Sequence, residues 1–529
     1  MTDIPNIKRN EEEKFKSEDY LDYLTKNKIS LRKAKNNLEI QRKRKYKLLY
    51  MNDDNINISK EYQFHILKFD TSFNTIALYL NSNNPDLISY CLKEICYYFL
   101  ANCPNINEQK KIIESNFLMM LLYFGKKSLE QNNEFNLYYI LDILNNIQII
   151  EEGNIEFCRQ LFSYDFLDFY NNCLLKANKS NNDKYSSSIY KQITKILNNL
   201  INNDLSGTDD INFLFLRSDF FPLILEKFQE ENIKEIEDVE STIMLIASIV
   251  NIEDSSKFTN NDKKIIEVCL NILIEEAFST SNEKILAWIF RGISYISIYD
   301  EFNIKIIEGG ITLKILRMKF SKIKCTDNYL KIIRYAMMIL ANNLTCTDKA
   351  CQIFYDQNII DYYNNILEKF DDDSYIVKYI LIGLLNISIG SKSDVVKQSI
   401  IWNEKNIQKY LNYDDDIKHE IIKIIKYLLY KKVEERIKFI FNTKILEYLI
   451  FIFANGNIGK FICFKILSVI DYYLDLFKID AKGAQEYLII YNKFKDLFNS
   501  SEKIILLSEE GTKNNIISDI QKKIDNNYK

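Results

Sequence analysis

The clearest helical pattern in the chain is RYAMMILANNLT, residues 334–345. Its apolar residues recur at intervals of three and four, which is the pattern of a helix with one buried face. Six other stretches share the pattern, and each is followed by a polar break and a second, shorter apolar run: 137–150, 189–201, 241–252, 287–298, 378–389 and 419–430. The pattern therefore predicts successive helices over most of the chain.

These helices recur at a nearly constant interval. When the units are aligned on a late polar position, the steps between them are 53, 49, 47, 47, 44 and 41 residues, and the position falls at Asn146, Asn199, Ser248, Tyr295, Asn342, Asn386 and Tyr427. The steps approach the roughly 40–47 residues of HEAT and armadillo units. A unit of this size cannot bury its own apolar face, so we expect the units to stack into an all-α solenoid. The last helix of each unit is expected to line the concave side.

The composition narrows the class of protein. The 529 residues include only 4 Pro and 12 Gly, which disfavours an all-β fold because turns draw on both residues. The 10 Cys form no CxxC pair, so we expect reduced, mostly buried thiols in a cytosolic or nuclear protein. The only two histidines are His65 and His419, and P-loop, GxGxxG and GxSxG motifs are absent, so neither an enzyme nor a metal or cofactor site is predicted. No uncharged apolar run reaches 18 residues, and no membrane insertion is expected.

Residues 1–58 differ from the rest of the chain because they are highly charged and lack apolar periodicity. Between positions 26 and 47 there are ten basic residues and a single acid, Glu39, although the formal net charge of the whole chain is −4. Charge alone is compatible with a solvated tail, with a nucleic-acid-binding patch or with a ligand for an acidic protein surface. Spacing of Leu31, Lys35, Leu38 and Arg42 along a helix would give a basic face with a thin apolar stripe.

The combination of this segment with a helical array resembles the importin alpha family, whose members carry cargo with basic nuclear-localisation signals. The resemblance rests on a short pattern followed by a basic cluster: Leu31, Arg32, Lys33, Ala34 and Lys35, then Arg42, Lys43 and Arg44. It implies a right-handed superhelical array of armadillo repeats over residues 59–508, behind a mostly flexible N-terminal segment that binds importin beta. It also implies shuttling between cytoplasm and nucleus. Residues 482–504 are similar to the family's last repeat, which recruits an export factor, and 509–529 form a polar tail.

In that family each concave helix carries a Trp and, one turn later, an Asn that pairs with the backbone of an extended peptide. Here the Trp positions read Asp142, Lys195, Met244, Arg291, Met338, Ile382 and Lys423, and the chain's two tryptophans, Trp288 and Trp402, are out of register. The Asn positions survive better. The resemblance implies cargo-peptide contacts at Asn146, Asn199, Asp204, Asn342, Thr345, Asp348, Asn386 and Glu420. A lysine at position 195 would repel a basic peptide, so we expect basic peptides to bind mainly at the later repeats.

Two functional hypotheses remain. The first is a nuclear-import adaptor for cargo with basic signals, which links that cargo to importin beta. The second is an armadillo scaffold or dedicated carrier that serves one specific partner and has lost general signal reading. The loss of the groove tryptophans favours the second, and the intact segment 31–44 favours the first. Direct nucleic-acid binding is disfavoured because the array is net acidic.

Overall fold

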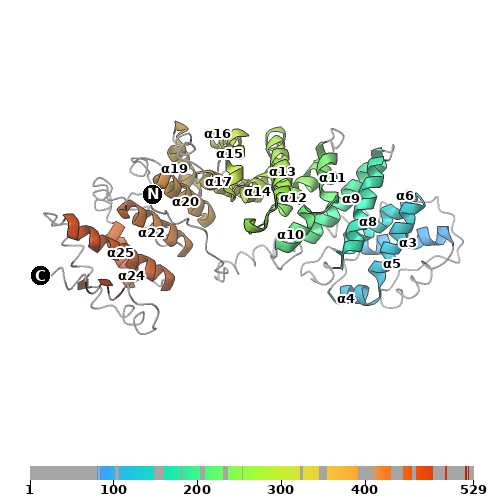
Figure 1. The fold of residues 1–529 in the computed structure, drawn as a ribbon, viewed down its shortest axis with the longest axis horizontal. Coiled ribbons are helices and arrows are strands. Elements are labelled where there is room, and N and C mark those ends of the chain that lie inside the picture. Colours follow the sequence, from blue (N-terminus) through green and yellow to red (C-terminus); the bar gives the residue numbers. More distant parts are fainter. Residues whose placement is uncertain are drawn as a thin grey trace. The chain divides into compact units, whose positions relative to one another are not determined.

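The computed structural model describes the chain at residue 80 and over 84–101, 106–147, 160–161, 163–179, 183–202, 209–229, 236–252, 254–321, 326–344, 354, 356–390, 409–410, 413, 415–430, 445–455 and 460–480, together with scattered positions between 492 and 522. Within these residues all regular structure is helical (Figure 1). The N-terminal segment with its residues 31–44 therefore lies outside the described part, as do Asp204, Thr345, Asp348 and Trp402.

Contacts within the chain divide it into two units, residues 1–208 with 218–227, and residues 209–217 with 228–529. The described helices of the first unit are α3 (Pro85–Ala101), α4 (Ile106–Glu114), α5 (Phe117–Glu130), α6 (Glu134–Ile147), α8 (Tyr164–Lys179), α9 (Asp183–Asn202) and the start of α11 (Phe220–Gln229). The last helix of each repeat, called here a third helix, packs on the third helix of the next repeat: α3 on α6, and α6 on α9.

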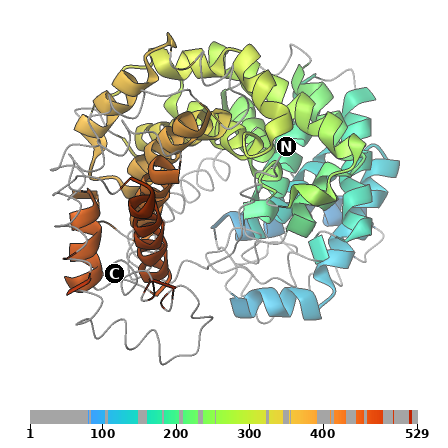
Figure 2. The ribbon, with the colours of Figure 1, turned by 60° about the vertical axis from the view of Figure 1, so that its left-hand side comes forward.

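The second unit continues the same arrangement. Its helices are α10 (Asp209–Leu216), α12 (Ile236–Ile249), α13 (Asn260–Ser279), α14 (Glu283–Ile296), α15 (Asp300–Glu308), α16 (Ile311–Arg317), α17 (Asp327–Asn343), α19 (Ile359–Phe370), α20 (Ser374–Gly390), α22 (Asp415–Tyr430), α24 (Ile445–Asn455) and α25 (Lys460–Asp480), with a 3₁₀ turn at Ser255–Lys257. Its third helices lie side by side in chain order: α12, α14, α17, α20, α22 and α25 (Figure 2).

One repeat shows how the sequence builds the unit. In α17 the buried side chains include Ile332, Ile333 and Ala336, so the apolar stripe read from the sequence faces the interior. The helix begins where the Thr326 side chain accepts a hydrogen bond from the Tyr329 amide, at 3.1 Å. Short α15 and α16 pack against α17 and against each other, which completes a three-helix repeat. All seven aligned polar positions fall in third helices, as predicted.

In the described loops, asparagine occupies left-handed backbone positions that glycine usually takes. Among the described residues, Asn116, Asn132 and Asn358 have positive φ of 55°, 55° and 58°. Asparagine adopts this left-handed conformation more readily than most residues other than glycine, because its short polar side chain can hydrogen-bond to the nearby backbone. Gly310, with φ 76°, makes the corresponding turn before α16. No described helix is both long enough and apolar enough to cross a bilayer.

Candidate functional site

The candidate site is the face built by the third helices, because the aligned polar positions lie on it. In the second unit two of these positions join neighbouring repeats. Asn342 on α17 is only 5% exposed, and its Nδ2 donates to Ser297 Oγ at 2.9 Å. Asn386 on α20 is half-buried and donates to the backbone oxygen of Ala341 at 2.8 Å. The two amides therefore act first as lateral links between third helices.

The corresponding residues of the first unit, Asn146 and Asn199, also form hydrogen bonds within the protein. Asn146 is 4% exposed, and its Nδ2 donates to the carbonyl oxygen of Asp142 in its own helix at 2.6 Å. Asn199 is half-buried and donates to Asn145 Oδ1 at 3.0 Å. The donor groups predicted for a peptide backbone are thus engaged within the protein at these two positions.

Asp142 occupies a position where the resembling family has Trp, and it has a structural role here. It is 4% exposed and lies on α6 between α3 and α9. One carboxylate oxygen accepts from Cys96 Sγ on α3 at 3.1 Å, and the other accepts from Gln192 Nε2 on α9 at 3.1 Å. The substitution therefore replaces an aromatic slot by a buried polar bridge across three helices.

The later repeats contain an acid that was predicted to hold a basic cargo side chain. Glu420 on α22 is 6% exposed, and its Oε1 lies 2.9 Å from Nζ of Lys423 on the same helix. Lys423 stands at another lost Trp position. The chain therefore supplies its own cation to the acid, and a basic ligand would compete with Lys423 for Glu420.

Aromatic side chains that sequence reasoning did not assign to the site lie one turn earlier on the third helices. Trp288 on α14, Tyr335 on α17 and Tyr379 on α20 each stand three residues before an aligned Trp position, and all three are half-buried. The three helices pack on one another in this order. We call this set the aromatic strip. The signal was present in the sequence as aromatic residues spaced 47 and 44 positions apart.

The first member of the strip is already paired with a cation of the protein. The Arg291 guanidinium carbon lies 4.8 Å from the centre of the Trp288 ring and 5.6 Å from that of Tyr295. Arg291 Nε also donates to the Tyr295 hydroxyl at 3.3 Å. Cation–π contacts of this kind hold the arginine between two aromatic side chains of α14.

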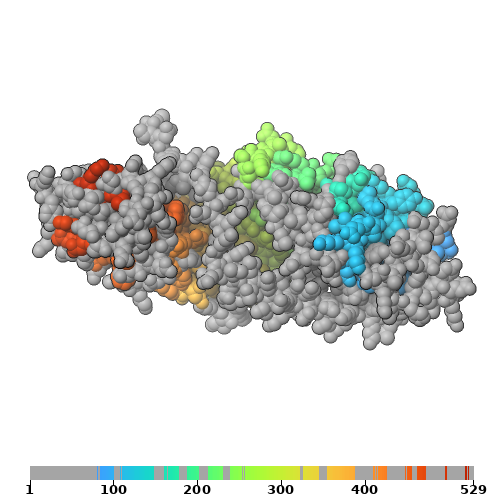
Figure 3. Space-filling view, turned by 90° about the horizontal axis from the view of Figure 1, so that it is seen from below, coloured from blue at the N-terminus to red at the C-terminus, as the bar shows by residue number. Residues whose placement is uncertain are grey.

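One further tyrosine, Tyr375, extends the strip on α20. The rings of Tyr375 and Tyr379 have centroids 4.8 Å apart, and the Tyr375 hydroxyl donates to the Met338 sulfur on α17 at 3.6 Å. Burial raises the pKa of the Tyr375 phenol, and neighbouring phenols raise it further: those of Tyr379, Tyr335 and Tyr295. The phenol therefore remains neutral at physiological pH. In the space-filling view the gold to orange residues of α20 and α22 form one continuous surface (Figure 3).

The charged residues beside the strip pair laterally between repeats. Arg334 Nη2 on α17 lies 2.7 Å from Asp373 Oδ2, and Lys378 Nζ on α20 lies 2.6 Å from Asp416 Oδ2 on α22. The cations that precede Tyr335 and Tyr379 in the sequence are therefore neutralised within the protein, whereas Arg291 contacts the rings of Trp288 and Tyr295. Among the described residues no group of three or more His, Cys, Asp or Glu could hold a metal ion.

Comparison with known proteins gives the fold but no family. No family model matches the sequence, and no curated protein matches it. The crystal structure of an engineered protein matches with a TM-score of 0.61 and 13% identity, covering 88% of this chain and 100% of that one. A chain from a study of the phosphorylation switch between cadherin and beta-catenin matches with a TM-score of 0.55 and 13% identity, covering 92% of this chain and 96% of its own.

A designed armadillo repeat protein in complex with the peptide (KR)4 covers 50% of this chain at 14% identity, with a TM-score of 0.38. Likeness at these identities shows the fold alone. The fold is an all-α armadillo-repeat solenoid, which confirms the fold class predicted from the sequence.

Proposed function

We propose that this chain is a protein-interaction scaffold that binds an extended peptide segment along the third helices of its second unit. The single observation that carries this proposal is the aromatic strip of Trp288, Tyr335 and Tyr379, repeated in register on three packed helices. A repeat array places identical positions at regular steps, which suits a ligand that is itself a repeating backbone. Half-buried aromatic faces contact aliphatic stems, proline rings and cationic groups of such a ligand.

The finer role that we propose is that of an adaptor in nuclear import, shuttling between cytoplasm and nucleus. It is supported by the resemblance of residues 31–44 to a segment that binds importin beta, and the cargo would bind on the third helices. Recycling by an export factor would involve residues 482–504.

A second candidate is a carrier dedicated to one partner, and two contacts favour it. The Trp288–Tyr295 slot already contains Arg291, and Glu420 is already paired with Lys423. Both arrangements lower the affinity for basic signal peptides in general. A cation of the peptide must compete with a cation of the protein itself, which has a high effective concentration at the site.

The scaffold function is tested by titrating the full chain with a fluorescent, lysine-rich bipartite signal peptide and, in parallel, with a library of extended peptides. The double substitution Tyr335→Ala and Tyr379→Ala should weaken any binding about tenfold, as expected from the loss of two aromatic contacts. Tyr123→Ala, which removes a 59% exposed tyrosine from α5, is the matched control. Equal losses in both variants would remove the aromatic strip from the proposed site.

Lys423→Met separates the two candidates. The methionine keeps the aliphatic stem and removes the charge, so Glu420 becomes available to a basic ligand. We expect the affinity for the bipartite signal peptide to rise several-fold at low salt, and Glu420→Gln in the same chain should cancel the gain. If Lys423→Met leaves a tight interaction unchanged, basic peptides do not use Glu420. Alanine substitutions at Arg42, Lys43 and Arg44 should separately abolish capture by importin beta if the adaptor role is correct.

A further inference from the structure

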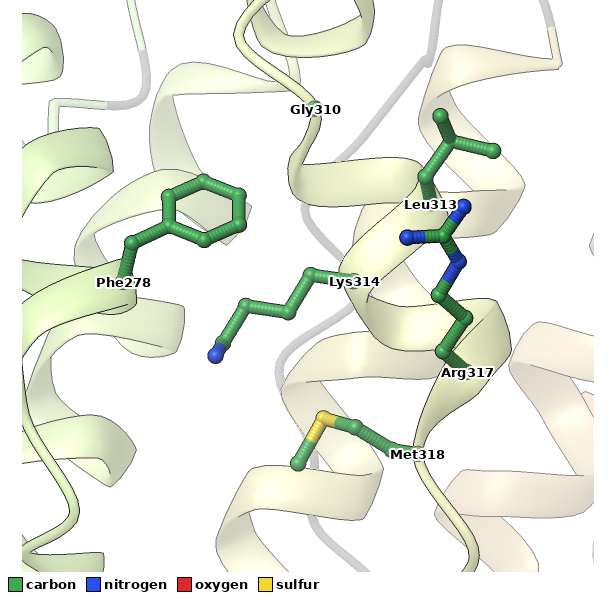
Figure 4. A pocket seen from close by; sticks show the side chains of 6 residues that line it. All are labelled: Phe278, Gly310, Leu313, Lys314, Arg317 and Met318. Atoms are coloured by element: carbon green, nitrogen blue, oxygen red, sulfur yellow. The ribbon is translucent and has the colours of Figure 1, made fainter.

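A second surface of the second unit lies on helices that do not belong to the third-helix face. It is a pocket of about 430 Å³ between α13 and α16, where α16 begins directly after the left-handed turn at Gly310. Figure 4 shows side chains from both helices around it, with Phe278 of α13 on one side and the residues of α16 on the other. The lining residues are Phe278, Gly310, Leu313, Lys314, Arg317 and Met318.

The apolar part of the pocket is unusually accessible. The Phe278 side chain is 55% exposed, although most large apolar residues of the second unit are fully buried. Leu313 on α16 and Met318, the residue that follows α16, complete the apolar lining, and both are half-buried. An exposed aromatic ring beside a leucine and a methionine is typical of a surface that a partner covers.

The polar part of the pocket is entirely cationic. Lys314 Nζ lies 5.1 Å from the centre of the Phe278 ring, and Arg317 follows on the next turn of α16. No acidic residue lines the pocket, and within the described ranges neither cation forms an ion pair. Other cations of this unit do have carboxylate partners on neighbouring helices or in the residue before one: Lys263, Lys284, Lys305, Arg334 and Lys378.

We propose that this pocket binds an acidic peptide segment of a partner protein, in which one bulky apolar side chain is flanked by carboxylates. The apolar side chain would lie against Phe278, Leu313 and Met318, and the carboxylates would pair with Lys314 and Arg317. Such a ligand complements both the charge and the exposed apolar wall of the pocket, because a partner that covers the wall also desolvates the two cations and must offer them carboxylates. Two cationic side chains that extend in different directions from α16 suit two carboxylates better than one (Figure 4).

This proposal does not depend on the peptide site on the third helices, because no residue is shared between the two. A scaffold with both sites would bind two segments of different chemistry. The strip would contact an extended segment on α14, α17 and α20, and the pocket would contact an acidic one on α13 and α16.

The test uses the full chain and a fluorescein-labelled decapeptide with a central phenylalanine flanked by aspartates, followed by fluorescence anisotropy at about 150 mM salt. Phe278→Ser should weaken binding about tenfold. The double charge reversal Lys314→Glu and Arg317→Glu should weaken it more than tenfold. Matched controls are Phe135→Ser, at a 78% exposed phenylalanine of α6, and the double reversal Lys110→Glu and Lys264→Glu at exposed lysines of α4 and α13. Both controls should bind as the unmodified chain does.

Three results would overturn the proposal. The first is that the controls lose as much affinity as the pocket variants, which would show general electrostatic attraction. The second is that replacing the central phenylalanine of the peptide by alanine, or its aspartates by asparagines, leaves binding unchanged.

The third concerns the chain's own residues 11–24, EEEKFKSEDYLDYL, which have the same chemistry as the proposed ligand. If the decapeptide binds only after Glu18→Gln, Asp19→Asn and Asp22→Asn are introduced into the full chain, the pocket serves this segment. The proposal of a separate partner would then be wrong.

Discussion

Removing the carboxylate of Asp262 should loosen the start of α13 and destabilise the second unit. Asp262 is 0% exposed and lies in the first turn of α13. Its Oδ2 accepts from the Thr259 amide at 2.8 Å, which closes a capping box, and from Arg217 Nη2 at 2.8 Å. The Arg217 guanidinium carbon lies 4.6 Å from the centre of the Phe213 ring, and Arg217 Nη2 also donates to the Lys257 carbonyl oxygen at 2.9 Å. One carboxylate thus joins the end of α10 to the start of α13.

The size of the effect follows from these contacts. Loss of the cap costs about 1 kcal/mol, and loss of a hydrogen bond to a charged group costs about 1.5–3 kcal/mol. The Arg217 side chain is 46% exposed, so water partly replaces its lost partner and the lower value applies. We therefore expect Asp262→Ala to lower the free energy of unfolding by about 2–3 kcal/mol. Asp262→Asn should cost less, since its amide oxygen can still accept from the Thr259 amide.

The same contacts give a pH dependence with a definite sign. Burial is the largest influence on the Asp262 pKa and raises it, but the hydrogen bonds from Arg217 and Thr259 together outweigh burial and the pKa is lowered. The folded pKa is therefore below the unfolded value of about 3.9. The stabilisation is fully present above that value and is lost as the pH falls through it toward the folded pKa.

Two measurements check this. Urea unfolding at pH 7 and at pH 3 gives the free energy of unfolding, and amide hydrogen exchange shows whether protection is lost first at the start of α13. Glu275→Ala is the matched control, because Glu275 is an exposed acid of the same helix. The assigned role of Asp262 would be wrong if both variants lowered the free energy of unfolding equally. It would also be wrong if Asp262→Ala lowered that free energy by the same amount at pH 7 and at pH 3.

Three further changes have definite expected outcomes. Gly383→Ala should destabilise the chain by about 1–3 kcal/mol, because the added Cβ would overlap the Tyr363 hydroxyl of α19, and thermal unfolding measures this. Burial, with a smaller effect of Glu94, raises the pKa of the Cys91 thiol to about 12. N-ethylmaleimide at pH 8 should therefore leave Cys91 unmodified in the folded chain, which mass spectrometry can measure, and rapid labelling would contradict the burial of this thiol. Burial lowers the pKa of His419 to about 4, so the neutral imidazole stabilises the fold fully above a pH of about 6.5, and this contribution is lost as the pH falls toward 4. His419→Phe should therefore make the free energy of unfolding depend less on pH between these values. An unchanged slope would exclude His419 as the source of the pH dependence.

The helices and their period could be read from the sequence because both depend on local properties. Apolar spacing along one helix determines which face is buried, and a constant step between helices makes stacking the only way to bury those faces. All seven aligned polar positions therefore fall in third helices, from Asn146 on α6 to Tyr427 on α22. The scarcity of glycine likewise agrees with the asparagines found in left-handed turns.

Contacts between repeats depended on the tertiary structure. A sequence shows that position 142 has lost an aromatic residue, but only packing places Asp142 between Cys96 and Gln192, 46 residues before it and 50 after it. The aromatic strip was overlooked because its members contribute to one surface only when α14, α17 and α20 are stacked.

Local sequence pattern is thus sufficient to predict the helical repeat and which positions are equivalent along it. The tertiary structure decided which of those side chains are already satisfied within the protein. Asn146, Asn342 and Glu420 are engaged internally, although their sequence context predicts binding residues. The physical reason is that a side chain's hydrogen-bonding capacity is a property of its type, whereas its partners are determined by distances across helices far apart in the chain.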